Sequence, residues 1–203
     1  MQTSNFIENL VNAKLMPYMF GAFGWLLAWK LQSLLLNLIP SLDYATGVAL
    51  VFLPAGIRTL SVLVFGLRGA MGVFIGALFS TIEYMGHLPV FDASILLVIC
   101  AISAFSAYLM MQLVCWWQKI GAELDELKFS DVLLIVFSQG VLSATLHQFV
   151  YAHTNIDDVY TDPSHMERFM LWAGMATGDI VGSMLFMLGG IALVNLFHSL
   201  RQH

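Results

Sequence analysis

The chain has 203 residues, of which 59% are hydrophobic and 10% are charged, and its formal net charge is −5. Soluble domains hold about 45–50% apolar and about 25% charged residues, so this composition predicts an all-α integral membrane protein with one transmembrane domain over residues 1–203. The absence of a basic patch excludes nucleic-acid binding, and no residue pattern is typical of a catalytic centre or a cofactor site. We therefore expect neither an enzyme nor a bound cofactor.

Residues 1–14 carry apolar side chains at helical spacing between polar ones, which predicts a short helix at the membrane surface. Six apolar runs follow, and each is read as one membrane crossing. They predict a bundle of about six helices that contacts the lipid bilayer, with spans near residues 16–39, 45–66, 69–85, 93–117, 132–151 and 169–197.

The second and third runs form a hairpin around Gly66 and Gly69. Pro54 lies inside the second run, has no backbone N–H to donate and clashes with the preceding turn of a helix. The second helix is therefore predicted to be broken or kinked near Pro54.

Cationic residues outside the spans are distributed unequally. Arg168 lies on one side, and the other side holds Lys14, Arg68, Lys119, Lys128 and Arg201. The positive-inside rule then places both termini and the 118–131 loop in the cytoplasm.

Small residues at four-residue spacing allow membrane helices to approach closely, and the chain carries two such ridges. Gly72 and Gly76 form the first, and Gly174, Gly178 and Gly182 form the second. These glycines are predicted to pack helices together.

Arg58 and Asp179 lie at similar depth in their spans, about 16–18 Å from the same membrane surface at 1.5 Å per residue. One interpretation is a structural ion pair, because buried charges in membranes usually pair. The other is a site for a small anionic ligand at Arg58, near a helix start that Pro54 and Gly56 would free.

A second polar group is expected nearer the outer surface, where Glu83 and His87 share one helical face and His147 and Tyr151 share another. With His153, these side chains are predicted to share a cavity. Carboxylate and imidazole groups suit a proton relay or a divalent metal, but the spacing matches no dense metal motif, so hydrogen bonding within the bundle is the favoured interpretation and no metal is expected.

Two segments resemble the MASE-type membrane-associated sensor domains of bacterial histidine kinases and diguanylate cyclases. They are FLPAGIR with the following GLRGAMGVFIGALF, and LWAGMATGDIVGSMLFML. The resemblance implies a sensor in signal transduction, and the positions it carries over are Pro54, Gly56, Arg58, Gly178, Asp179 and Gly182. The family has about eight crossings and a cytoplasmic output domain, whereas this chain has fewer runs and ends at His203.

These observations favour a sensor-like inner-membrane module that binds a small ligand or a partner membrane protein within its bundle. Any output would come from a separate signalling or transport protein that contacts the cytoplasmic loop. Two alternatives stay open, a small solute transporter or substrate-binding subunit of an importer, and an assembly subunit without a ligand.

Overall fold

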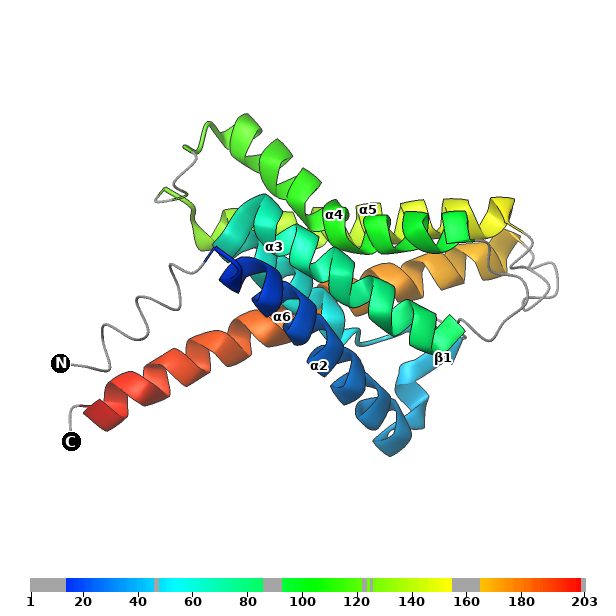
Figure 1. Cartoon of the computed structure of the whole chain (residues 1–203), viewed down its shortest axis with the longest axis horizontal. Helices are drawn as coiled ribbons and strands as arrows, with labels where there is room; N and C mark the ends of the chain where they lie inside the picture. Colours follow the sequence, from blue (N-terminus) through cyan, green and yellow to red (C-terminus); the bar gives the residue numbers. More distant parts are fainter. Residues whose placement is uncertain are drawn as a thin grey trace.

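The computed structural model describes residues 14–45, 48–85, 93–121, 124, 126–154 and 165–201. The elements are α2 (Met16–Leu38), the 3-10 turn η1 (Pro40–Leu42), β1 (Asp43–Ala45), β2 (Val48–Ala49), α3 (Leu53–Met85), α4 (Ala93–Gln118), α5 (Phe129–His153) and α6 (His165–Arg201). Figure 1 shows the helices as a bundle, and β1 and β2 form a two-stranded antiparallel pair. The predicted surface helix at residues 1–14 lies almost wholly outside the described residues.

The described residues contain five helices that are long and apolar enough to cross a membrane, rather than the six predicted. The membrane class is supported, but the helix count is wrong. The third predicted span and the last part of the second both fall within α3. The described residues 48–52 of the second run are not helical, and residues 53–65 measure only about 20 Å as a helix, too short for a full crossing.

α3 reverses direction at Gly66, whose backbone is left-handed (φ 57°, ψ −134°). A side chain built on Gly69 would collide with the carbonyl of Ser61. In a straight helix these residues would lie about 12 Å apart along the axis, so the chain must turn back between them. α3 therefore has two arms, residues 53–65 and 67–85, and the hairpin read from the sequence is present.

The second helix was predicted to be broken or kinked near Pro54, and the structure has a helix start there, because Pro54 is the second residue of α3. There the missing N–H removes no hydrogen bond, since the first turn has no partner for it. The break comes before Pro54. The chain leaves α2, passes through η1 and the antiparallel pair β1–β2, and reaches Leu53 through residues 50–52, which belong to no helix or strand.

We refer to the described residues 43–45 and 48–52 as the extended segment. Its backbone polar groups need partners, because lipid offers none. The N–H of Phe52 donates to the carbonyl of Gly178 in α6 (3.0 Å). The side chain of Gln32 in α2 donates to the carbonyl of Val51 and accepts from the N–H of Leu53, each at 2.9 Å.

The two glycine ridges contact different partners. Gly72 and Gly76, on the second arm of α3, lie against the backbone of α2. Gly178 and Gly182 lie against the carbonyls of Ala49 and Phe52, so the second ridge receives the extended segment instead of the helix that was predicted. Gly174 continues this surface beneath the side chain of Val48.

α3 lies at the centre of the fold and packs against α2, α4 and α6, while α5 bridges α4 and α6. The Gly66 turn, the end of α4 and the start of α5 share one end of the bundle, which we call the tip end. The other end, where α2 finishes and α6 begins, is called the loop end. An apolar cluster that includes Val62, Met111 and Ile135 fills the interior near the tip end.

Candidate functional site

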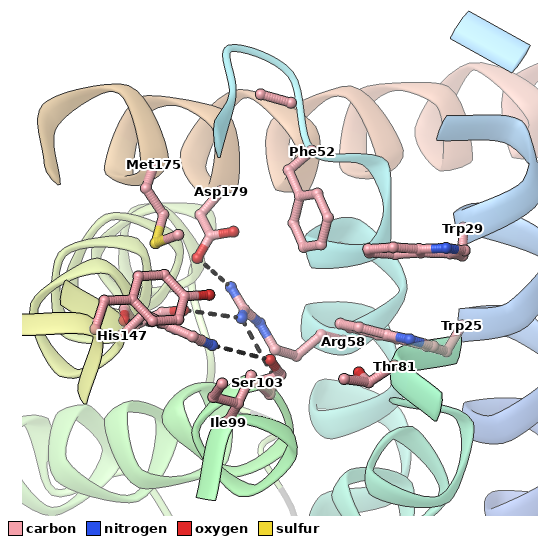
Figure 2. Close-up of a pocket in the computed structure, with 13 residues that line it drawn as sticks. Trp25, Trp29, Phe52, Arg58, Thr81, Ile99, Ser103, His147, Met175 and Asp179 are labelled. Carbon is pink, nitrogen blue, oxygen red and sulfur yellow. Dashed lines mark hydrogen bonds and ion pairs between the residues drawn. The ribbon is translucent and has the colours of Figure 1, made fainter. Parts of the chain in front are cut away.

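A cavity of about 100 Å³ lies between the extended segment and all five helices (Figure 2). One side of it is aromatic and the other polar. Its lining consists of Trp25, Trp29, Ala49, Phe52, Arg58, Thr81, Ile99, Ser103, Ser143, His147, Tyr151, Met175 and Asp179.

Arg58 is 1% exposed, and its guanidinium group reaches three elements from the first arm of α3. Nη2 donates to Oδ2 of Asp179 at 2.9 Å. Nη1 donates to the hydroxyl of Ser143 at 3.2 Å and to the carbonyl of Ser103 at 3.3 Å. The N–H at Nε has no hydrogen-bond partner.

The ion pair between Arg58 and Asp179 brings together the two charges that depth alone placed near each other. Both side chains are almost fully buried, so each charge would be costly without the other. The pair has a single contact, through one carboxylate oxygen, although a guanidinium and a carboxylate can form two parallel bonds.

His147 on α5 joins the polar side of the cavity to α4. Its Nδ1 lies 2.8 Å from the carbonyl of Ser143, and because a carbonyl only accepts, Nδ1 carries the proton. Its Nε2 lies 3.2 Å from the hydroxyl of Ser103. In the neutral ring, Nε2 therefore accepts from Ser103, whose carbonyl in turn accepts from Arg58.

The aromatic side of the cavity depends on the extended segment. The ring of Phe52 meets Trp25 and Trp29 edge-on, with centroid distances of 6.1 and 5.9 Å. The indole N–H of Trp25 donates to the hydroxyl of Ser80 at 2.9 Å, which fixes the ring. The indole N–H of Trp25 thus has its hydrogen-bond partner outside the cavity lining.

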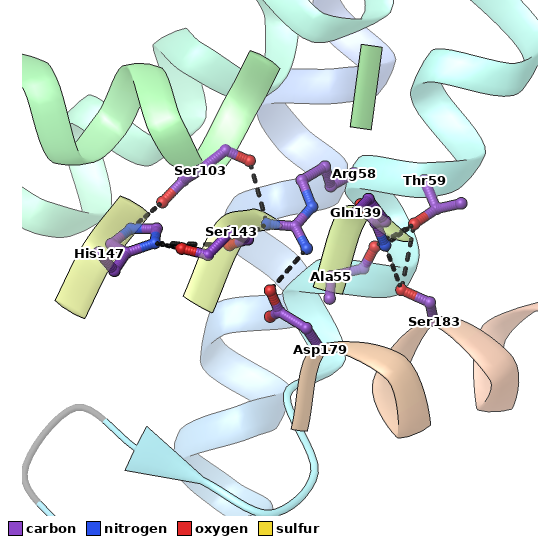
Figure 3. A network of polar contacts seen from close by, with 9 residues as sticks. All are labelled: Ala55, Arg58, Thr59, Ser103, Gln139, Ser143, His147, Asp179 and Ser183. Carbon is purple, nitrogen blue, oxygen red and sulfur yellow. Dashed lines mark hydrogen bonds and ion pairs between the residues drawn. The ribbon is translucent and has the colours of Figure 1, made fainter. Parts of the chain in front are cut away.

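A second polar cluster lies beside Arg58 toward the tip end (Figure 3). The amide Nε2 of Gln139 donates to the hydroxyls of Thr59 (2.7 Å) and Ser183 (2.9 Å). All three residues are buried. Gln139 Oε1 and the nearby hydroxyls of Ser61 and Ser106 are buried without a partner.

The predicted site residues are only partly brought together. Arg58, Asp179, His147 and Tyr151 line the cavity. Glu83 does not, which corrects its assignment to the buried polar centre. It is exposed and forms a 2.6 Å ion pair with Lys30, whose long side chain reaches it from α2.

The remaining predicted positions lie away from the cavity. Pro54 and Gly56 sit in the first turn of α3, where Gly56 contacts the ring of Phe186. His153 is exposed and bonds to the carbonyl of Phe149, and His87 lies outside the described residues. No group of three His, Cys, Asp or Glu residues able to hold a metal occurs in the part of the chain that the structure describes.

Sequence reasoning missed Gln32, Gln139 and the aromatic residues Trp25, Trp29 and Phe52. Both glutamines were visible as polar residues inside apolar runs, a signal of a buried partner. The tryptophans gave no such signal, because aromatic residues are common in lipid-facing and core positions alike.

No family model matches this chain, and no match was found among the curated proteins or the solved structures. The resemblance to MASE-type sensor domains therefore stays a prediction.

Proposed function

We propose that this protein is a sensor-like module of the bacterial inner membrane that binds a small ligand in the cavity beside Arg58. The observation that carries the proposal is a buried guanidinium group that lines a largely apolar cavity and keeps one N–H without a partner. Mostly apolar pockets with a few convergent polar groups are typical of small-molecule sites. The proposed role is binding, not catalysis.

The proposed orientation follows the cationic residues. Lys14, Arg68 and Lys119 belong to the tip end, so the tip end faces the cytoplasm and the loop end faces outward. Tyr151, near the loop end of α5, and Trp29, near the middle of α2, border the cavity. In this orientation a ligand enters from outside, and both termini with the 118–131 loop are available to a separate signalling protein.

The single contact between Arg58 and Asp179 offers a way to report binding. A ligand carboxylate that bonds to the guanidinium would compete with Asp179 for the same N–H groups. Asp179 belongs to α6, so its release loosens the helix that runs to the tip end. In this mechanism Arg58 has two states, one paired with Asp179 and one released from it. The ligand shifts the equilibrium toward the released state because it binds that state more tightly.

Carboxylate probes test this proposal, and the fluorescence of Trp25 and Trp29 supplies the signal. Acetate, propionate and benzoate are titrated onto purified protein, with benzamide as the uncharged analogue of benzoate. We expect at least one carboxylate to bind more tightly than benzamide. Arg58→Gln should abolish this binding, whereas Asp179→Asn should tighten it by removing the competing charge.

Glu83→Gln is the matched control, because it removes a carboxylate that lies outside the cavity and should leave binding unchanged. If Asp179→Asn weakened carboxylate binding as much as Arg58→Gln did, the competition mechanism would be wrong. If no carboxylate bound at all, an anionic ligand would be excluded.

Transport is the second candidate function. The cluster of Thr59, Gln139 and Ser183 continues the buried polar surface from Arg58 toward the tip end, and Oε1 of Gln139 in this cluster has no hydrogen-bond partner. Buried polar residues inside a membrane bundle often mark a substrate pathway. Uptake of a labelled probe into proteoliposomes that hold only this protein would favour transport over sensing.

A further inference from the structure

A second hollow lies at the tip end and shares no lining residue with the central cavity. It is a groove of about 920 Å³ between the start of α2, the Gly66 turn of α3 and the last three turns of α4 with the loop that follows. Its apolar wall includes Leu63, Val64 and Met111. Its rim includes Gln112, Trp116 and Arg68, and all three are exposed.

Arg68 gives this groove its charge. Its side chain is exposed, and it forms no ion pair or hydrogen bond within the described ranges. Lys119 adjoins the groove residue Ile120 in sequence, and Lys14 precedes Pro17, which also lines the groove; both lysines are exposed. Glu126 is exposed in the following loop but does not line the groove. Among the residues that the structure describes, the rim therefore presents a positive charge without an ion-pair partner.

The depth of the groove matches the outer part of a lipid leaflet. On α4 it runs from Tyr108 to Trp116, about 12 Å along the helix axis. Trp116 is 78% exposed at the end of a membrane-length helix, the position in which tryptophan marks the headgroup region. The groove thus has a cationic, aromatic mouth at the membrane surface and an apolar wall that leads into the hydrocarbon.

We propose that this groove binds an anionic phospholipid, with the phosphate at Arg68 and the upper part of an acyl chain along Leu63, Val64 and Met111. An arginine fork matches the geometry of a phosphate, and basic pockets between membrane helices at the cytoplasmic side suit anionic headgroups. The apolar wall distinguishes a lipid from a free phosphate ion, which would have no use for it. This proposal does not depend on a ligand in the central cavity.

The test compares the protein in nanodiscs of phosphatidylglycerol with the protein in nanodiscs of phosphatidylcholine, which have the same acyl chains. Phosphatidylglycerol should raise the melting temperature by about 2–4 °C relative to phosphatidylcholine. Arg68→Gln should remove this difference, while Arg168→Gln, the same change at the other end of the bundle, should keep it. Native mass spectrometry should show phosphatidylglycerol retained by the wild type and lost from Arg68→Gln.

Three outcomes would overturn the proposal. The first is an equal melting temperature in both lipids. The second is an equal loss in both arginine variants, which would indicate general surface electrostatics. The third is the same stabilisation by inorganic phosphate in detergent, which would identify a simple anion site. Comparison of the two variants in phosphatidylcholine separates a folding defect of Arg68→Gln from a loss of lipid binding.

Discussion

The two glycine ridges look alike in sequence, yet one receives a helix and the other receives extended backbone. Gly72 and Gly76 face α2, which satisfies its own backbone hydrogen bonds. Gly178 and Gly182 face residues 49–52, which depend on α6 and on Gln32 for theirs. A small-residue motif therefore indicates close approach of a backbone, without specifying which kind of backbone approaches.

The largest difference in stability between the two ridges should appear when one glycine in each ridge is replaced by alanine. Gly182→Ala would force a side chain against the carbonyl of Phe52, which is held between α6 and Gln32 and cannot retreat. We expect a loss of about 3 kcal/mol in the free energy of unfolding, the upper end of the usual range for overpacking. Gly76→Ala meets the carbonyl of Ala22 at 2.7 Å, but α2 packs mainly on α3 and can shift outward, so about 1 kcal/mol is expected.

Unfolding of both variants in detergent, followed by helical circular dichroism, measures this difference. Equal losses would show that the extended segment moves as freely as α2 does.

The second ridge also carries Asp179, and the next largest effect should come from its pairing with Arg58. An unpaired charge near the membrane centre costs at least about 2.5–3.5 kcal/mol. Arg58→Leu and Asp179→Leu should each lose about that much stability, and the double variant should lose less than the sum of the two. A double-mutant cycle measures the coupling energy between them. Additive losses would mean that the 2.9 Å ion pair contributes little to the fold.

The smallest effect is expected from loss of the hydrogen bonds that Gln32 makes to the extended segment and to Leu53. Gln32→Met keeps the size of the side chain but removes both hydrogen bonds to Val51 and Leu53. Buried groups left without partners cost about 1–3 kcal/mol, so we expect a loss of about 2 kcal/mol. Gln118→Met, an exposed position at the end of α4, should change stability little. Faster hydrogen exchange at Leu53 in Gln32→Met would locate the effect, and unchanged exchange there would contradict it.

Much of the fold could be predicted from the positions of the apolar runs. The predicted spans at residues 16–39 and 93–117 agree with α2 and α4 to within one residue at each end. The predictions at 132–151 and 169–197 were too short by two to four residues at each end, because polar residues that continue a helix beyond the membrane do not look apolar. The reversal at Gly66 was visible as a glycine-bounded break between two runs.

The extended segment could not be predicted from the sequence. Residues 45–52 are as apolar as a typical membrane-spanning helix, and the spacing of their apolar residues does not distinguish a helix from an extended chain. The described residues 51 and 52 are held outside a helix by distant partners, Gln32 on one side and Gly178 on the other. The prediction that Glu83 belongs to the buried polar centre was wrong for a related reason. Its spacing from His87 favoured an inward face, but Lys30 on another helix supplied a partner at the surface.

The extended segment also has a consequence for biogenesis. Phe52 bonds to Gly178, a separation of 178 − 52 = 126 residues, and at synthesis rates of about 5–20 residues per second α6 emerges roughly 6–25 s after Phe52. Until then residues 49–52 lack the glycine surface and one of their hydrogen-bond acceptors, and unpaired backbone groups cost several kcal/mol in hydrocarbon. Insertion of this stretch therefore waits for the last helix, so the aromatic wall of the cavity is completed only when the rest of the bundle has been assembled.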